Sequence, residues 1–416
     1  MTDPAGISFL SYRRSRIAEA SLLIAAQHDL GIPTWHDLVN LDDEHTEDEL
    51  SRVLSDQGTA NAVVWLTPDV HQSAIIQRVE LPKIQERVSL RDGFFVVAVA
   101  AGRLARDDVD QVVETTLTPH DWSEWNLRSV DGDPIELEEA QRVARRVLEK
   151  RINAVHSRLS SGEPLTLLAY TRTRPPSATG ASLVLDWSAR FQGREATTNA
   201  WVHHLLPAIE TVAQTIGTFA PGRSVVATGQ ASLSAAVALG YAFMTPRGID
   251  IAWKQRLPSG EEEVWSLRTA GTDSGFEVES RGKEVKADSL AVLVSISSNV
   301  EPAFAATKET LPRFRAILHG RLRHPHPIAA GEATDIAQKV RQSIQDARTE
   351  FKGLHGRVHL FISVPAGLAM IIGQLLNAVG PVQLYEHRAD NAIGFYVPSA
   401  ELSQNPPTWG SASSVL

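Results

Sequence analysis

The chain has 416 residues, of which 43% are hydrophobic and 21% are charged, so it is long enough for two globular domains. It has no run of roughly 18 to 20 apolar residues and no signal segment at its start, and we therefore expect a cytoplasmic protein without a membrane span. Because the chain has no cysteine, it has no disulfides and no thiolate metal ligands, and its 14 histidines show no metal-binding spacing. Its net charge of −9 argues against general DNA binding but permits a small anionic ligand.

Short apolar runs alternate with helical patterns through the first third of the chain, as a parallel α/β sheet requires. Strands are predicted at residues 6–12, 32–36, 61–66 and 93–101, and helices at residues 17–29 and 47–55. The run at 93–101 is the longest continuous apolar one here, which indicates a strand buried on both faces of its sheet. The pattern predicts a small doubly wound α/β domain over residues 1–135.

A charged helical pattern follows at residues 131–158, and Ser160-Ser-Gly-Glu-Pro164 then breaks it. We assign residues 136–162 to a connecting helix and linker, and residues 163–416 to a second α/β domain. Its predicted strands are residues 165–170, 183–187, 223–227, 249–254, 263–268, 289–296, 358–363 and 382–386. Its predicted helices lie near residues 200–217, 231–242, 302–310, 331–353 and 366–379.

Phe9-Leu-Ser-Tyr-Arg-Arg14 closes the first predicted strand, so its polar residues lie at the carboxyl edge of the sheet, where doubly wound folds bind ligands. This segment resembles the first conserved box of Toll/interleukin-receptor (TIR) domains. Residues 31–37 resemble the second strand of that family, residues 38–49 its long following loop, and residues 62–69 its third strand with a Thr-Pro exit. The resemblance covers about residues 5–130 and implies a flavodoxin-like, doubly wound parallel sheet.

Enzymatic TIR domains use one glutamate, on the helix after the third strand, to cleave NAD⁺ into nicotinamide and ADP-ribose or its cyclic form. The resemblance places that glutamate at Glu80, although Ser73 stands seven residues before it rather than six, and Ile76 replaces a common aromatic. One carboxylate is enough because nicotinamide leaves as a neutral molecule, so only the oxocarbenium-like ribose needs stabilising. NAD⁺ is then the substrate, and no further cofactor is expected. The residues expected to line the substrate pocket are Ser11, Tyr12, Arg13, Trp35, Asp37 and Asp43.

The segment from His359 to Gly380 is an apolar strand, a Ser-x-Pro turn and an apolar helix. It is similar to the signature of SAVED domains, which sense cyclic oligonucleotides in bacterial antiphage signalling (CBASS). The strand at residues 290–296, with its exit Ser297-Ser-Asn299, also resembles that family. The resemblance spans roughly residues 165–400 and implies a sensor of a cyclic oligoadenylate, with cyclic triadenylate as the first choice.

A cyclic oligoadenylate needs hydrogen-bond donors for its phosphates and aromatic faces for its adenines. Predicted strand exits and one helix start offer such groups, and these exits are expected to converge at one edge of a sheet. The candidate ligand residues are Tyr170, Arg172, Arg174, Trp201, Ser297, Ser298, Asn299, Ser363, Tyr385, His387 and Arg388.

Together, the two resemblances predict an effector with sensor and enzyme in one chain. We expect a cyclic oligoadenylate-activated NAD⁺ glycohydrolase that depletes NAD⁺ in antiphage defence, and that becomes active when ligand drives self-association into a homo-oligomer or filament. A different reading is a non-catalytic TIR scaffold that self-associates on nucleotide binding. A nucleosidase or deoxyribosyltransferase would share the small α/β fold, but would not need a second sensing domain of this size.

Overall fold

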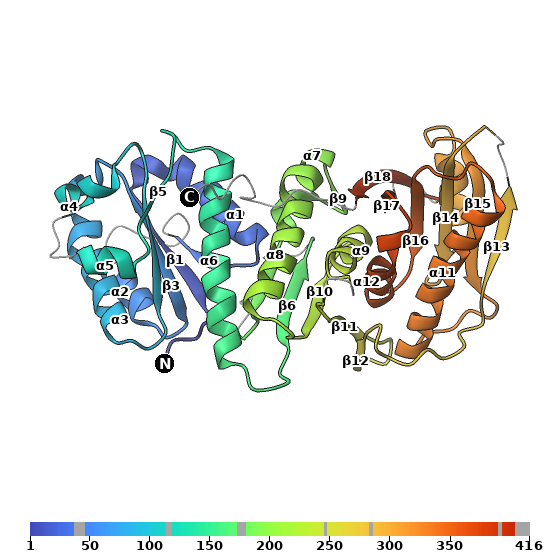
Figure 1. Cartoon of the computed structure of the whole chain (residues 1–416), viewed down its shortest axis with the longest axis horizontal. Coiled ribbons are helices and arrows are strands. Elements are labelled where there is room, and N and C mark those ends of the chain that lie inside the picture. The colour runs from blue at the N-terminus through green and yellow to red at the C-terminus, as the bar shows by residue number, and fades with distance from the viewer. Residues whose placement is uncertain are drawn as a thin grey trace. The chain divides into compact units, whose positions relative to one another are not determined.

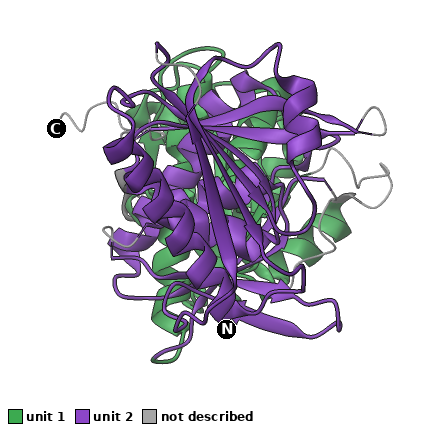
Figure 2. Cartoon of the chain, turned by 90° about the vertical axis from the view of Figure 1, so that its right-hand side faces the viewer, with its two compact units in different colours: residues 1–161, 176–185, 409–416 green, residues 162–175, 186–408 purple. Residues whose placement is uncertain are grey.

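The computed structural model describes residues 1–36, 46–113, 119–172, 180–244, 248–282, 286–389 and 393–403. Figure 2 shows the two compact units into which the chain divides. The first contains residues 1–161, 176–185 and 409–416, and the second contains residues 162–175 and 186–408. Within the described ranges, no helix has both the length and the apolar character needed to cross a bilayer.

The first unit is built around a parallel five-stranded sheet in the order β2-β1-β3-β4-β5. Its strands are β1 (Ile7–Ser11), β2 (Thr34–Trp35), β3 (Thr59–Leu66), β4 (Phe95–Ala100) and β5 (Arg128–Ser129). This is the flavodoxin-like doubly wound order, in which the chain changes direction between β1 and β3. β3 is buried along its whole length because it carries apolar side chains to both faces of the sheet.

Helices cover both faces of this sheet, with α1 and α6 on one side and α2, α3 and α5 on the other (Figure 1). The α-helices are α1 (Ile17–Asp29), α2 (Thr46–Ser55), α3 (Leu81–Ser89), α4 (Val109–Val112), α5 (Pro119–Glu124) and α6 (Leu137–Arg158). Short turns of helix occur at η1 (Arg14–Arg16), η2 (Val70–Gln72), η3 (Ile76–Glu80) and η4 (Arg106–Asp108). The predicted charged helix is thus α6, which contacts α1 with its apolar stripe and belongs to the first unit.

The second unit contains two large sheets and a short two-stranded antiparallel one. The first large sheet has β6 (Leu165–Tyr170), β10 (Val225–Gln230) and β11 (Ile251–Arg256) parallel to one another. An antiparallel hairpin strand, β12 (Glu262–Trp265), pairs with β11. The elements between β6 and β11 are β7 (Leu183–Asp186), η5 (Ser188–Arg190), β8 (Phe191–Gln192), β9 (Glu195–Ala196), α7 (Thr198–Ala200), η6 (Trp201–Leu205), α8 (Leu206–Phe219) and α9 (Leu233–Ala242).

The other sheet has six strands in the order β13-β15-β14-β16-β17-β18. Its four central strands run parallel and are β14 (Ser289–Ser295), β15 (Phe314–Leu322), β16 (Val358–Ser363) and β17 (Val382–Arg388). Antiparallel strands β13 (Phe276–Gly282) and β18 (Phe395–Leu402) form its edges. The helices are α10 (Glu301–Thr307), α11 (Ala330–Glu350), α12 (Ala366–Leu375) and η8 (Leu376–Ala378).

The helices α9 and α12 bring the two sheets of the second unit together (Figure 1). They approach through two glycines, one on each helix. A Cβ atom added to Gly240 would lie 1.9 Å from the carbonyl oxygen of Met370, and one added to Gly373 would lie 2.1 Å from that of Val237. Glycine is therefore required at both positions, because the main chains of the two helices are in direct contact.

Candidate functional site

Glu80 lies at the carboxyl edge of the first unit's sheet. It ends the π-helical turn η3, its residue is 7% exposed, and its carboxylate accepts a hydrogen bond from the hydroxyl of Ser11, the last residue of β1. Proline occupies the second position of the following helix α3, and since Pro82 has no amide hydrogen to donate, the helix can widen into a π turn just before it. A carboxylate is thereby placed at the β1/β3 switch point, the usual ligand position in this strand order.

Arg13 lies at the same edge, but its guanidinium already pairs with a carboxylate of the protein. Its guanidinium pairs with the carboxylate of Asp69 and donates to the Asp69 carbonyl oxygen at 3.0 Å. The pKa of Asp69 lies below its ordinary value, because hydrogen bonds from Thr67 and Ser15 and the charge of Arg13 outweigh the burial that would raise it. The arginine therefore ties the exits of β1 and β3 together, and a substrate diphosphate would have to displace Asp69 to reach it.

The two aromatic residues predicted to line this site pack into the unit instead. Tyr12 is buried, and Trp35 is half-buried and stacks on Phe9 with ring centroids 5.0 Å apart and an interplanar angle of 12°. Their apolar area packs more favourably against the core than against solvent, and little of Tyr12 is left exposed to contact a substrate. The remaining predicted residues, Asp37 and Asp43, lie outside the described residues.

The second unit contains a cavity of about 400 Å³ between its two sheets. One wall comes from the end of β11 and from β12, and the other from the exits of β14 and β16 and from the loop between β15 and α11. The residues that line it are Gln255, Arg256, Leu257, Pro258, Trp265, Ile296, Ser297, Pro325, His326, Pro327, Ile328 and Pro365. Its size suits a small organic ligand, and its lining joins an aromatic ring and apolar side chains to a few polar groups.

The predicted serine cluster lies at the edge of this cavity. The amide of Ser297 donates to the carbonyl oxygen of Ser363 at 2.8 Å, and the hydroxyls of Ser298 and Ser363 lie 2.7 Å apart. The side-chain oxygen of Asn299 accepts a hydrogen bond from the amide of Glu301, the first residue of α10, at 3.0 Å. The parallel strands β14 and β16 thus bring together residues 65 positions apart, as expected for carboxyl ends of neighbouring strands.

Sequence reasoning missed most of the polar lining of the cavity. The side-chain oxygen of Gln255 accepts the amide of Gly367 at the start of α12, at 3.0 Å, and a Cβ atom on Gly367 would lie 2.8 Å from the ring of Trp265. The predicted strand stopped at residue 254, two residues short of Arg256. Continuing the strand through Gln255 and Arg256 would have placed both at a carboxyl edge beside the Ser-x-Pro turn.

A second group of predicted residues lies at the carboxyl ends of β6 and β17. Arg388 pairs with Glu195 at 3.1 Å, and Arg172 lies near both Arg194 and Glu386. Burial, with the charge of Arg194, lowers the pKa of Arg172 despite the opposing charge of Glu386. Tyr170 ends β6 and is half-buried, and Arg174 lies outside the described residues.

Glu386, which sequence reasoning did not select, lies at the centre of this group. Its residue is 5% exposed, and its carboxylate accepts the amide of Ser234 in the first turn of α9 at 3.0 Å. Burial raises the pKa of the Glu386 carboxyl, although hydrogen bonds from Ser234 and Ser232 and the charge of Arg172 act to lower it. The helix start that could have received an anionic ligand already holds the protein's own carboxylate.

Two residues predicted to bind the ligand belong to the core instead. Trp201 is 1% exposed and packs edge-on against Phe191, with ring centroids 6.0 Å apart. Tyr385 is buried, and its hydroxyl lies 2.8 Å from the Nδ1 of His359. Burial lowers the pKa of His359 to about 4 and raises that of Tyr385 to about 12, so this pair is neutral. An aromatic face that is covered by protein on all sides cannot stack on an adenine.

His387 is the remaining predicted ligand residue. It is half-buried, and its ring packs edge-on against Tyr396 with centroids 5.5 Å apart. A Cβ atom at Gly394 would lie 2.3 Å from the Nε2 of His387, so the chain passes close over this ring. Across the part of the chain that the structure describes, no three histidine, aspartate or glutamate side chains gather closely enough to bind one metal ion.

Residues 209–402 match the family model of the SMODS-associated and fused to various effectors sensor domain, SAVED. A curated relative, CD-NTase-associated protein 4 of Acinetobacter sp. (strain ATCC 27244 / 9458), is 26% identical over 184 residues, which are 44% of this chain. The aligned part covers 37% of that relative, so this chain spans little more than a third of its length.

Two solved structures align with most of the chain at low sequence identity. The Acinetobacter baumannii Cap4 SAVED/CARF-domain containing receptor with the cyclic trinucleotide 3'3'3'-cAAA is 15% identical, with a TM-score of 0.49, over 87% of this chain and 86% of that one. The Moraxella osloensis Cap4 receptor is 14% identical, with a TM-score of 0.42, over 94% and 100%. The predicted SAVED domain is confirmed by the family match within residues 209–402, and the TIR identity of the N-terminal unit stays a prediction.

Proposed function

We propose that this chain is a cyclic oligoadenylate-activated NAD⁺ glycohydrolase of the TIR type. The observation that carries the proposal is the buried carboxylate of Glu80, which accepts a hydrogen bond from Ser11 at the β1/β3 switch point of a flavodoxin-like sheet. A carboxylate buried at the ligand edge of such a sheet supports a catalytic role. The family match of residues 209–402 supplies the sensing half of the proposal.

Glu80 would stabilise the ribose as the bond to nicotinamide breaks. Positive charge develops at the ribose carbon while nicotinamide leaves as a neutral molecule, so no general acid is needed. A carboxylate in a partly desolvated site stabilises this charge more strongly than one in water. Ser11 would hold the carboxylate in position, and water or a hydroxyl of the same nucleotide would complete the product.

The cavity of the second unit would hold the activating nucleotide. Arg256 offers a cation for a phosphate, and Ser297 offers a hydroxyl. The pocket lies between the two sheets that α9 and α12 bring together, so a bound ligand would contact both of them. Ligand-driven self-association would then assemble NAD⁺ sites between neighbouring copies, through a head-to-tail contact that can continue as an open filament.

The test is nicotinamide release from NAD⁺ by the purified full chain, with and without cyclic triadenylate. Glu80→Gln removes the charge but preserves shape, and we expect activity to fall about a hundredfold or more. Glu86→Gln is the matched control on the same helix, because Glu86 is exposed and pairs only with Lys83 at 2.8 Å among the described contacts. Glu80→Gln activity within about tenfold of wild type, or 1.4 kcal/mol in barrier, would exclude Glu80.

A non-catalytic scaffold is distinguished by the same preparation. Ligand-dependent light scattering without any nicotinamide release, over a range of NAD⁺ concentrations, would support the scaffold and exclude the enzyme.

A further inference from the structure

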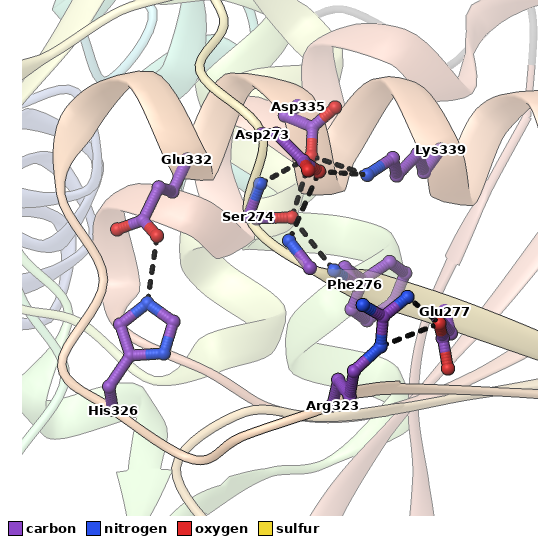
Figure 3. Close-up of polar contacts among 10 residues, drawn as sticks. Asp273, Ser274, Phe276, Glu277, Arg323, His326, Glu332, Asp335 and Lys339 are labelled. Atoms are coloured by element: carbon purple, nitrogen blue, oxygen red, sulfur yellow. Dashed lines mark hydrogen bonds and ion pairs between the residues drawn. The ribbon is translucent and has the colours of Figure 1, made fainter.

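The loop between β15 and α11 forms one lip of the cavity in the second unit. Four of its residues line the cavity, in the order Pro325, His326, Pro327 and Ile328. A proline on each side of His326 fixes the backbone angle at those positions, so the loop has few conformations available. Figure 3 shows His326 directed toward Glu332 on α11.

Both ring nitrogens of His326 face acceptors. Nδ1 lies 2.9 Å from the carbonyl oxygen of His324, and Nε2 lies 2.7 Å from a carboxylate oxygen of Glu332. A carbonyl oxygen and an ionised carboxylate can only accept hydrogen bonds, whereas a neutral imidazole has a single N–H. Both contacts are satisfied together only when the ring carries two protons, and the geometry therefore selects the imidazolium.

The electrostatics favour the same state. The hydrogen bond to the His324 carbonyl, and then that to Glu332, raise the pKa of His326 above its ordinary value. The other ionisable residue among those lining the cavity is Arg256, at the end of β11. His324 is exposed on the same loop. His326 and Arg256 thus give the cavity a cationic rim, with Glu332 placed behind the histidine on α11.

Glu332 connects the lip to a firmly held helix. Its second carboxylate oxygen accepts the amide of Ala329 at 2.8 Å and so caps the start of α11. One turn further, Asp335 accepts hydrogen bonds from the amide and the hydroxyl of Ser274, at 3.0 and 2.6 Å, and pairs with Lys339 at 2.8 Å (Figure 3). The helix cannot follow the loop easily, so loss of the His326–Glu332 contact frees the lip and leaves α11 in place.

We propose that His326, held as an imidazolium by Glu332, is a positioning residue that fixes the lip of the sensor cavity for an anionic ligand, and that ligand affinity consequently falls as pH rises. The identity of the ligand rests on the proposed function. Because the folded state favours protonated His326, the interaction is fully present below the histidine's ordinary pKa and is lost as pH rises through its value in the folded protein.

The experiment measures cyclic triadenylate binding to the full chain by calorimetry between about pH 6 and pH 8.5, across the histidine range. An exposed charge pair is a weak contact, so we expect wild-type affinity to fall about three- to fivefold across this range. His326→Gln should bind with the weaker affinity at every pH. His324→Gln is the matched control and should behave as wild type, because the contact made at that position uses the main-chain carbonyl.

The variant Glu332→Gln distinguishes the two roles of this side chain, its charge beside His326 and its cap at the start of α11. Glutamine can still cap the helix start, so α11 is preserved while the carboxylate is removed. Without the carboxylate charge, the pKa of His326 should be lower, so ligand affinity should begin to fall at a lower pH than in the wild type. The midpoint of the ¹H–¹³C titration of the His326 ring in labelled protein should shift to lower pH as well.

The outcomes distinguish the two proposals. Wild-type binding that does not vary with pH, or that varies equally in His326→Gln, would overturn the role of His326 while leaving the nucleotide sensor intact. A wild-type chain that binds no cyclic triadenylate at any pH, despite a raised His326 pKa in the titration, would overturn the proposed ligand.

Discussion

Replacement of Gly373 by alanine should destabilise the second unit by separating α9 from α12. The added Cβ atom would lie 2.1 Å from the carbonyl oxygen of Val237 and 3.0 Å from the amide nitrogen of Tyr241. Both are main-chain atoms, so they cannot turn aside as a side chain would. The helices must move apart by an ångström or more, and the close packing between them is lost over several residues.

The magnitude follows from two opposing effects. Overpacking against a rigid neighbour costs about 3 kcal/mol at the upper end of its usual range. Alanine favours a helix over glycine by about 1 kcal/mol, which offsets part of that cost. A net loss of about 2 kcal/mol remains, which corresponds to a fall of roughly 4 to 8 °C in the melting temperature of a domain of this size.

The assay is thermal unfolding of the full chain, with hydrogen exchange to locate the change in α9 and α12. Gly217→Ala, in α8, is the matched control, because its Cβ atom would meet only the flexible side chain of Ile249, with the nearest atom at 3.4 Å. It should be neutral or slightly stabilising. A Gly373→Ala protein that melts at or above the wild-type temperature, with unchanged exchange in α9, would refute the inference that these main chains are in rigid contact.

Four further predictions concern the enzyme, the sensor, assembly and pH. Ser11→Ala removes the donor to Glu80, and we expect kcat for NAD⁺ cleavage to fall about tenfold with little change in KM; an unchanged kcat would contradict this role. Arg256→Glu should weaken binding of cyclic triadenylate in calorimetry, because it replaces the cation at the cavity rim with a repelling charge; unchanged binding would exclude Arg256 as a phosphate partner. Ligand should drive self-association in sedimentation, with activity rising more steeply than linearly with protein concentration, and full activity of a ligand-saturated monomer would exclude this. Since burial lowers the pKa of His359 to about 4, the unfolded chain binds its proton first, and stability should fall as pH falls from about 6.5 toward 4. His359→Gln should remove that part of the pH dependence in chemical unfolding, and an identical pH profile in the variant would rule out His359 as its source.

The parts of this fold that local sequence determined are its buried parallel strands and their long helices. Residues 62–66 and 360–362 are continuous apolar runs, and such runs favour strands buried on both faces, as in β3 and β16. A polar residue at the end of an apolar strand is expected at the carboxyl edge of the sheet, which is why Ser11, at the end of β1, and Ser363, at the end of β16, were correctly placed.

Three strands at and near the edges of the six-stranded sheet, β13, β15 and β18, were not predicted. β13 is largely polar, β15 interrupts its apolar alternation with His319 and Arg321, and β18 contains a proline. These segments become strands because a neighbouring strand completes their hydrogen bonds, with cross-strand ion pairs such as Arg321 with Glu279. That partner is distant in the sequence, so no local pattern contains it.

Which aromatic and polar groups face a ligand was also decided only by tertiary structure. Trp201 and Trp265 are both almost fully buried, yet Trp201 packs against Phe191, whereas Trp265 forms part of a cavity wall. Nothing in the residues next to either tryptophan distinguishes the two. Gly240 and Gly373 let α9 and α12 touch, and this contact joins helices whose residues are more than a hundred positions apart in the sequence. Local sequence specifies which segments are strands and helices, and close packing between distant segments specifies where they leave a space.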